Sequence, residues 1–402
     1  MTEASEHGKG LKEAALGHPE RIGPYHLLER IGEGGMGVVY VAEQTEPVRR
    51  RVALKLIKAG MDTREVIARF HSERQALALM NHPNIARILE AGATEGGRPF
   101  FVMEYVPGMP LLEYCDAQRL PLGQRLRLFV QICEAVQHAH QKGVIHRDLK
   151  PSNLLVKEED GQPVPKVIDF GVAKAVAQRL SDLTVHTQLG GLIGTPEYIS
   201  PEQARMTGLD VDTRADVYSL GAVLYELLTG SRPFDFLNPA LGLAEVQAGI
   251  LEQEPRSPSQ RVTRGEHARD RAKARRSDVR QLARRLHHDL DWIVLKALEK
   301  DRNRRYASAS ELAADIEHYL EGRPVVAGPR STRYRLARFV RRHRSLLALG
   351  SLAVALLIAG IIGTTLGLMR ARKEAERARV QTDIAREVHS FLTQDLLSAV
   401  AP

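Results

Sequence analysis

Cysteine is scarce in this chain of 402 residues, which contains only Cys115 and Cys133. Two cysteines cannot build a disulfide framework, and they lack the clustered spacing of a zinc site. A reducing compartment is therefore expected for at least the part of the chain that carries them. The apolar fraction of 43% and the charged fraction of 26% are those of a globular protein, which excludes a disordered chain.

Charge is absent from residues 345–369, SLLALGSLAVALLIAGIIGTTLGLM. A helix rises about 1.5 Å per residue, so this stretch more than spans a hydrocarbon core of roughly 30 Å. We therefore expect one transmembrane helix here. The N-terminus contains no apolar run, so no cleavable signal peptide is predicted.

The net charge of +8 is concentrated in two basic stretches, 256–285 and 323–344. No acidic residue interrupts the arginines that precede the apolar stretch, whereas Glu374 and Glu376 dilute those that follow it. This bias predicts a single-pass membrane protein whose N-terminal side is cytoplasmic. Anionic lipid headgroups then explain the juxtamembrane arginines better than nucleic acid does.

Hydrophobic patterning also divides the parts of the chain on either side of the apolar stretch into segments. Residues 1–22 are expected to form a flexible tail, and 370–402 a helical segment. Between them, a small β-rich lobe at about 23–106 and a larger helical lobe at about 107–322 predict an α+β fold. The basic stretch 256–285 is an insertion in the larger lobe. It is either a solvated, partly helical excursion or a docking surface, and the sequence leaves both open.

Apolar periodicity places the individual elements. The helix at 122–143 is amphipathic and ends at Gly143, a residue suited to a C-cap. The helix at 213–230 is largely apolar and is expected to be buried. The remaining elements are strands within 25–44 (two, around a glycine turn), 51–57, 86–92 and 98–106, and helices at 63–80, 291–301, 308–322 and 370–398.

A glycine-rich turn, GEGGMGVVY, places glycines at positions 32, 34 and 37. The same G-x-G-x-x-G spacing occurs in dinucleotide-binding turns, which require a helix after the turn. Here the β-branched, alternating VVYVAE follows, so a hairpin is favoured. Its backbone N–H groups can approach phosphate oxygens without obstruction by side chains.

VALK places Lys55 on the next strand, where a lysine by itself would be read as a solvated strand residue. Its expected partner is Glu73, from the middle of the 63–80 helix. An ion pair between them would hold the Lys55 ammonium near the α- and β-phosphates of a nucleotide.

Two polar loops complete a candidate site, GVIHRDLKPSN at 143–153 and KVIDFGVAK at 166–174. Asp169 follows an apolar strand, and Asn153 can supply a second hard oxygen, as Mg²⁺ prefers. Asp148 would accept the proton of an attacking hydroxyl, and Lys150 would neutralise charge on a phosphoryl group. Taken alone, the first loop could also be an ordinary polar turn.

In this order, the Gly-rich loop, VALK, HRDLKPSN, DFG, GTPEYISPEQ and DVYSLG resemble the eukaryotic-type Ser/Thr protein kinase family from about Tyr25 to Gly322. The resemblance implies a bilobal protein kinase fold with ATP between the lobes, Mg²⁺ as cofactor and protein hydroxyls as substrates. With the apolar stretch after the kinase domain, the layout resembles bacterial receptor-type kinases, which implies a place in the cell (inner) membrane with the kinase domain in the cytoplasm.

The resemblance also assigns roles to single residues. It implies that Met103 is the gatekeeper, that Glu104, Tyr105 and Val106 form the adenine-binding hinge, and that Thr195 contacts the catalytic loop and the substrate. It pairs Glu202 with Arg305, places Asp216 as a support of the catalytic loop and gives His146 a structural role. The remaining nucleotide-binding residues expected are Ile31, Gly32, Glu33, Gly34, Gly35, Met36, Gly37, Val39 and Ala53.

Arg147, directly before Asp148, implies activation by phosphorylation of the loop at 172–194. Its acceptors are Ser181, Thr184 and Thr187, of which Thr184 and Thr187 are favoured. That these are merely polar residues of a loop is the alternative.

Two rival functions remain. A catalytically silent scaffold on this fold usually lacks the lysine, the base or the metal-binding aspartate, and all three are present here. A membrane-tethered nucleic-acid binder would need aromatic residues among the basic ones, so no nucleic-acid partner is expected. A G-x-x-x-G pair, Gly363 and Gly367, would allow a homodimer through the apolar helix, although small residues are common in such helices.

Overall fold

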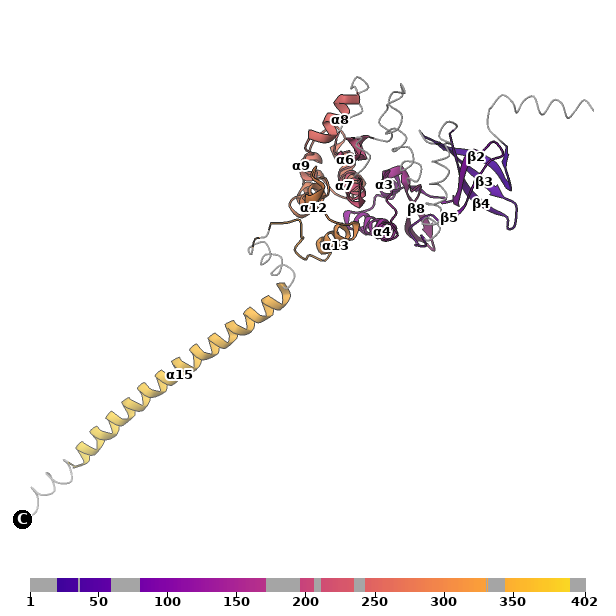
Figure 1. Cartoon of the computed structure of the whole chain (residues 1–402). Helices are drawn as coiled ribbons and strands as arrows, with labels where there is room; N and C mark the ends of the chain where they lie inside the picture. The colour runs from indigo at the N-terminus through magenta and orange to yellow at the C-terminus, as the bar shows by residue number, and fades with distance from the viewer. Residues whose placement is uncertain are drawn as a thin grey trace, which may run out of the picture. The chain divides into compact units, whose positions relative to one another are not determined.

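The computed structural model describes residues 20–34, 37–58, 80–170, 196–205, 211–234, 243–329, 331 and 344–390 (Figure 1). The chain divides into two compact units, residues 1–330 and 331–402. In the first unit, Figure 1 shows strands β2–β5, which lie within residues 25–93, on one side, and helices α6–α9, α12 and α13, which lie within residues 201–320, on the other. The predicted helix at 63–80 lies outside the described residues, except for Met80.

The small lobe is built on an antiparallel sheet of six strands in the order β1-β2-β3-β4-β6-β5. Its apolar face buries Tyr25, Leu54 and Phe100, among other residues, in one hydrophobic cluster. The predicted strands are confirmed within a few residues. Their bounds are β1 Arg21–Ile22, β2 Tyr25–Glu33, β3 Gly37–Gln44, β4 Arg50–Ile57, β5 Ile88–Ala93 and β6 Pro99–Glu104.

The glycine-rich turn joins two antiparallel strands, as the sequence predicts. Gly32 pairs with Val39 in the ladder between β2 and β3, and the Gly34 N–H donates to the Gly37 carbonyl at 2.9 Å. A Cβ on Gly37 would lie 2.5 Å from the Leu56 carbonyl oxygen, so only glycine fits against β4 at this position. A strand, and not a helix, follows the turn, so the predicted hairpin is confirmed and the dinucleotide-binding alternative is excluded.

The large lobe is helical, with a small sheet in the order β7-β8-β9. Helix α7 is buried at its centre, and Gly230 ends it in the left-handed conformation with φ +70°. The predicted helices at 122–143 and 213–230 are therefore confirmed. The elements are β7 Met109–Pro110, α3 Leu111–Ala117, α4 Leu122–Gln141, β8 Leu154–Glu159, β9 Gln162–Val167, α6 Pro201–Ala204, α7 Thr213–Thr229, α8 Leu243–Glu252, α9 Pro258–Arg261, α10 Ala268–Ala274, α11 Val279–Leu286, α12 Asp289–Ala297 and α13 Ala309–Leu320.

The basic insertion at 256–285 folds as α9, α10 and α11, so its expected helical content is confirmed. It is not wholly solvated, however, because Arg275 is only 1% exposed. The Arg275 guanidinium donates to the carbonyls of Leu227 (3.0 Å) and Glu226 (3.3 Å) at the C-terminal end of α7. From the other side, Arg125 on α4 donates to the Ala274 carbonyl at 2.7 Å. Two buried arginines thus attach the insertion to the lobe.

Packing of the first unit continues beyond residue 322. Val325 is 4% exposed. The backbone N–H groups of Val326 and Ala327 donate to the buried carboxylate of Asp315 on α13, at 2.5 and 2.9 Å. The same carboxylate accepts from the Tyr306 hydroxyl at 2.8 Å. Residues 325–327 therefore belong to the folded lobe.

The second unit contains one long helix, α15 (Arg344–Ser390). Within its segment 348–390, an 18-residue window reaches a mean hydropathy of 2.3 and has no buried part within the chain, so the helix is long and apolar enough to cross a membrane. It includes most of the predicted span at 345–369. The helix continues through the predicted 370–398 segment as far as Ser390, and residues 391–402 lie outside the described part.

Candidate active site

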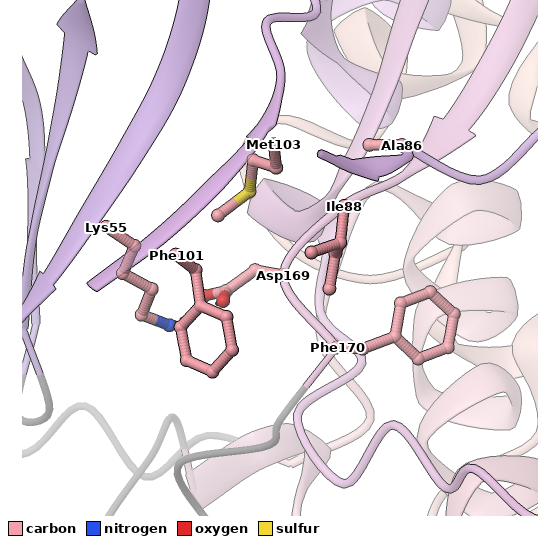
Figure 2. Close-up of a pocket in the computed structure, with 7 residues that line it drawn as sticks. All are labelled: Lys55, Ala86, Ile88, Phe101, Met103, Asp169 and Phe170. Carbon is pink, nitrogen blue, oxygen red and sulfur yellow. Dashed lines mark hydrogen bonds and ion pairs between the residues drawn. The ribbon is translucent and has the colours of Figure 1, made fainter. Parts of the chain in front are cut away.

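A pocket opens beside the small-lobe sheet, where β4, β5 and β6 approach the segment after β9 (Figure 2). Figure 2 shows Lys55 reaching from β4 toward Asp169, with Phe101 beside them, whereas Phe170 turns toward the helices. The residues that line the pocket are Lys55, Ala86, Ile88, Phe101, Met103, Asp169 and Phe170.

Lys55 and Asp169 form the charged centre of this pocket. Lys55 Nζ lies 2.5 Å from Asp169 Oδ1, and the two side chains are 13% and 28% exposed. Asp169 adopts φ +59°, a conformation that non-glycine residues rarely take and that often marks functional sites. Glu73 lies outside the described residues, so the predicted Lys55–Glu73 pair remains a prediction.

The loop at 143–153 brings three of the predicted residues together. Lys150 Nζ lies 3.0 Å from Asp148 Oδ2. Asn153 Nδ2 donates to the Asp148 carbonyl at 2.8 Å, so its Oδ1 is the side-chain atom that can face a cation. The 3-10 turn Pro151–Asn153, which starts with proline, holds this geometry.

Asp216 supports this loop through hydrogen bonds to its backbone. It is fully buried and accepts from the backbone N–H groups of His146 and Arg147, both at 2.8 Å, and lies 2.7 Å from His140 Nε2. Burial alone would raise the pKa of Asp216, but hydrogen bonding and charge from His140 and His146 outweigh it and lower that pKa. The implied supporting role of Asp216 is confirmed.

His146 is buried, and its ring contacts structural groups. Its Nε2 lies 3.0 Å from the Ile168 carbonyl, and its ring packs against the Phe170 ring in a tilted arrangement, at 4.7 Å between centroids. Burial lowers its pKa despite the nearby carboxylates. These contacts agree with a structural role for His146.

The strand β6 leads into the predicted hinge. Met103 lines the pocket and pairs with Ala53 across the sheet, and Val39 pairs with Lys55. The Glu104 N–H donates to the Arg87 carbonyl at 2.8 Å, and Val106 is buried.

The Glu104 side chain lies 3.1 Å from Lys166 Nζ. Burial would raise the pKa of Glu104, but the hydrogen bond and charge of Lys166 lower it on balance.

Of the other predicted nucleotide-binding residues, Gly32, Glu33, Gly34 and Gly37 lie in the hairpin, and Ile31 is 49% exposed on β2. Further site residues lie outside the described part of the chain, and their roles remain predictions: Gly35, Met36, Glu73, Ser181, Thr184, Thr187 and Thr195.

The pocket also contains residues that sequence reasoning missed. Phe101 lies two positions before Met103, so strand alternation places both on the same face and could have indicated it. Ala86 and Ile88 carry no such signal, because only the folded chain brings them to the pocket.

The predicted Glu202–Arg305 pair is confirmed in the large lobe. Arg305 Nη1 and Nη2 lie 2.7 and 2.8 Å from the two carboxylate oxygens of Glu202, and the Arg305 side chain is fully buried. This bidentate pair attaches α6 to the segment before α13.

The two-lobed fold, with its pocket beside the small-lobe sheet, is that of the protein kinases, and comparison with known proteins agrees. The "Protein kinase domain" family model matches residues 25–315. The chain therefore belongs to the protein kinase family.

Its relatives include "Serine/threonine-protein kinase PknB" of Mycobacterium leprae, 37% identical over 305 residues, with 75% of this chain and 43% of that protein covered. Another is "Probable serine/threonine-protein kinase SCO3848" of Streptomyces coelicolor, 38% identical over 315 residues, with 77% and 42% covered. The matches thus span less than half the length of these curated relatives.

Among solved structures, the Mycobacterium tuberculosis PknI kinase domain matches with a TM-score of 0.51 and 25% identity. This match covers 74% of the present chain and 97% of that domain. The expected bilobal fold and the resemblance to Ser/Thr protein kinases are confirmed.

Proposed function

We propose that this chain is a membrane-anchored Ser/Thr protein kinase that transfers the γ-phosphate of ATP to protein hydroxyls. The observation that carries the proposal is the ion pair of Lys55 with Asp169 in a pocket of the kinase fold. The loop cluster of Asp148, Lys150 and Asn153 supports it.

The donor set fits magnesium and nucleotide. A site built from protein side chains alone would need three or more His, Cys, Asp or Glu side chains around one point, and the described residues contain no such group. One carboxylate and one amide, Asp169 and Asn153, match a cation that takes its other ligands from phosphates and water. When bound, ATP supplies the phosphoryl group and Mg²⁺ neutralises its charge.

The residues would then act mainly by positioning. Lys55 would hold the α- and β-phosphates, and Asp148 would orient the attacking hydroxyl and accept its proton. Lys150, 3.0 Å from Asp148, would stabilise the charge that develops on the transferred group. The Lys55, Asp148 and Asp169 side chains are all present, which favours an active kinase over a silent scaffold.

The apolar part of α15 supports a membrane anchor, and the arginines before it support a cytoplasmic kinase domain and contact with anionic headgroups. Gly363 and Gly367, four residues apart on this helix, would allow a homodimer suited to autophosphorylation in trans. Activation by phosphate on Thr184, Thr187 or Ser181 belongs to the same proposal.

The test uses the full chain in detergent micelles, incubated with Mg-ATP beside an Asp148→Asn control, with phosphosites mapped by mass spectrometry. A general base typically contributes 10²- to 10⁴-fold, so the control is expected to lose at least about 100-fold in rate. Phosphate at 181–195 in the wild type alone would support the proposal. Folded, ATP-binding protein that phosphorylates neither itself nor a generic Ser/Thr substrate would support the scaffold instead.

A further inference from the structure

Arg147 lies in a strained conformation directly before Asp148. Its φ of +64° is in the left-handed region, which non-glycine residues rarely adopt. Such a conformation persists only where surrounding contacts hold it, and it clusters at functional sites. The contacts that hold Arg147 therefore also determine how Asp148 is presented.

Three of these contacts lie on the backbone. The Arg147 N–H donates to Asp216 Oδ1 at 2.8 Å. The next peptide plane, between Arg147 and Asp148, is held at both of its polar atoms. Its N–H donates to His146 Nδ1 at 3.3 Å, and its carbonyl accepts from Gln203 Nε2 at 2.9 Å.

Gln203 reaches this carbonyl from the first turn of α6. Its Oε1 accepts from both the Ser200 N–H (3.2 Å) and the Ser200 hydroxyl (2.9 Å), and the Gln203 N–H donates to Ser200 Oγ at 3.4 Å in a capping box. A backbone N–H can only donate, so the Ser200 N–H orients Oε1 toward itself. The Gln203 amide nitrogen then faces Arg147.

We infer that Gln203 is a positioning residue for phosphoryl transfer. By holding the Arg147–Asp148 peptide plane, it orients the Asp148 carboxylate. Helix α6, which carries Gln203, is itself held by the Glu202–Arg305 pair. The inference rests on the proposed kinase function and adds to it a link between α6 and the catalytic loop.

The expected kinetic effect follows from what Gln203 contacts. Loss of one neutral hydrogen bond to the loop corresponds to about a 3- to 10-fold fall in kcat. The KM for ATP should change by less than about 2-fold, because Gln203 is not among the residues that line the nucleotide pocket.

Three variants of the full chain in detergent separate positioning from capping. Gln203→Glu keeps an oxygen for Ser200 but replaces the donor that faces the Arg147 carbonyl. Gln203→Met removes both contacts at nearly the same length. Ser200→Ala removes the capping hydroxyl and leaves the amide of Gln203 able to reach Arg147.

Both Gln203 variants are expected to lose kcat with an unchanged KM for ATP. Ser200→Ala is expected to lower the melting temperature about as much as Gln203→Met, while its kcat stays within about 2-fold of wild type. The proposal is overturned if Ser200→Ala loses as much kcat as Gln203→Met, since capping alone would then explain the effect. It is equally overturned if Gln203→Glu retains kcat.

Amide hydrogen exchange in residues 144–153 gives a readout that needs no activity. Exchange is expected to rise in both Gln203 variants but not in Ser200→Ala. An inactive wild-type chain that shows this pattern would reject the proposed function and retain the contact with the loop. Equal exchange in all four proteins would reject the positioning role.

Discussion

At the scale of single residues, the buried imidazole of His146 makes stability depend on pH. Its pKa is lowered below the ordinary value of 6.5 by burial. The unfolded chain therefore binds more protons than the folded one once the pH falls below about 6.5. Stability should decrease from there toward pH 5, with a slope of at most about 1.4 kcal/mol per pH unit from this residue. Well above pH 6.5, where the imidazole is neutral in both the folded and the unfolded state, His146 should add no further dependence.

The measurement is urea unfolding at several pH values between 5 and 7, followed by the fluorescence of Trp292, the chain's one tryptophan. His146→Phe should be less stable overall but should show a smaller slope. His82, whose pKa is also lowered by burial, contributes to both proteins and cancels in the comparison. An identical slope in wild type and variant would contradict the prediction.

Individual site residues differ in how far the sequence reveals them. Asp148, Lys150 and Asn153 lie within six residues of one another, so a short motif was enough to predict their cluster. Lys55 and Asp169 are 114 positions apart, and their pairing depends on the fold. Gln203 lies in the GTPEYISPEQ motif, but its contact with Arg147 exists only once α6 packs beside the loop, so the motif did not reveal this role.

At the scale of elements, the insertion is held in place by Arg275. Burial lowers the pKa of Arg275 to about 10, and neighbouring Arg125 acts in the same direction, so the guanidinium remains charged at neutral pH. Replacement by Met would leave the α7 carbonyls of Leu227 and Glu226 without these donors. Arg275→Met should lower the free energy of unfolding by about 2 to 4 kcal/mol, measured by urea unfolding.

The matched control is Arg280→Met, on the exposed side of α11 in the same insertion. Arginine and methionine have similar helix propensities, so this change should stay within about 0.5 kcal/mol of wild type. Equal losses in the two variants would show that the charge of the insertion, rather than its buried contact, sets stability.

Elements with a strong period were predictable, and those defined by tertiary contacts were not. Helix 213–230 was evident from its apolar run and its terminal glycine, and the hairpin from VVYVAE after the glycine turn. The packing of α9–α11 was hidden because eleven basic residues indicate a solvated surface. That Arg275 among them is buried follows from the position of the α7 C-terminus, which composition does not encode.

At the scale of the whole molecule, the end of the folded lobe can be tested by truncation. A chain ending at 322 lacks the Val326 and Ala327 N–H groups, which leaves the buried Asp315 carboxylate without two of its donors. It should melt at least several degrees below a chain ending at 331. The comparison by circular dichroism is direct, since both proteins lack α15. Equal melting temperatures would show that residues 323–331 add no stability.

The two cysteines make this chain a suitable background for chemical labelling. Cys115 and Cys133 are fully buried, and burial raises the pKa of Cys115 to about 11 and that of Cys133 well above the usual range. Both native thiols should therefore stay unreactive toward maleimides and oxidants in the folded protein. A cysteine introduced elsewhere would be the one reactive site.

Because the native thiols are unreactive, the proposed homodimer can be tested in membranes by cross-linking an introduced cysteine. Ala359→Cys lies one turn before Gly363, on the same face of the helix. Ile361→Cys lies two residues from Gly363, which is about 200° around the helix and therefore on the opposite face. Under mild oxidation, Ala359→Cys should form a covalent dimer on a non-reducing gel and Ile361→Cys should not. The chain without an introduced cysteine should run as a single monomer band, which would show that its native thiols do not react.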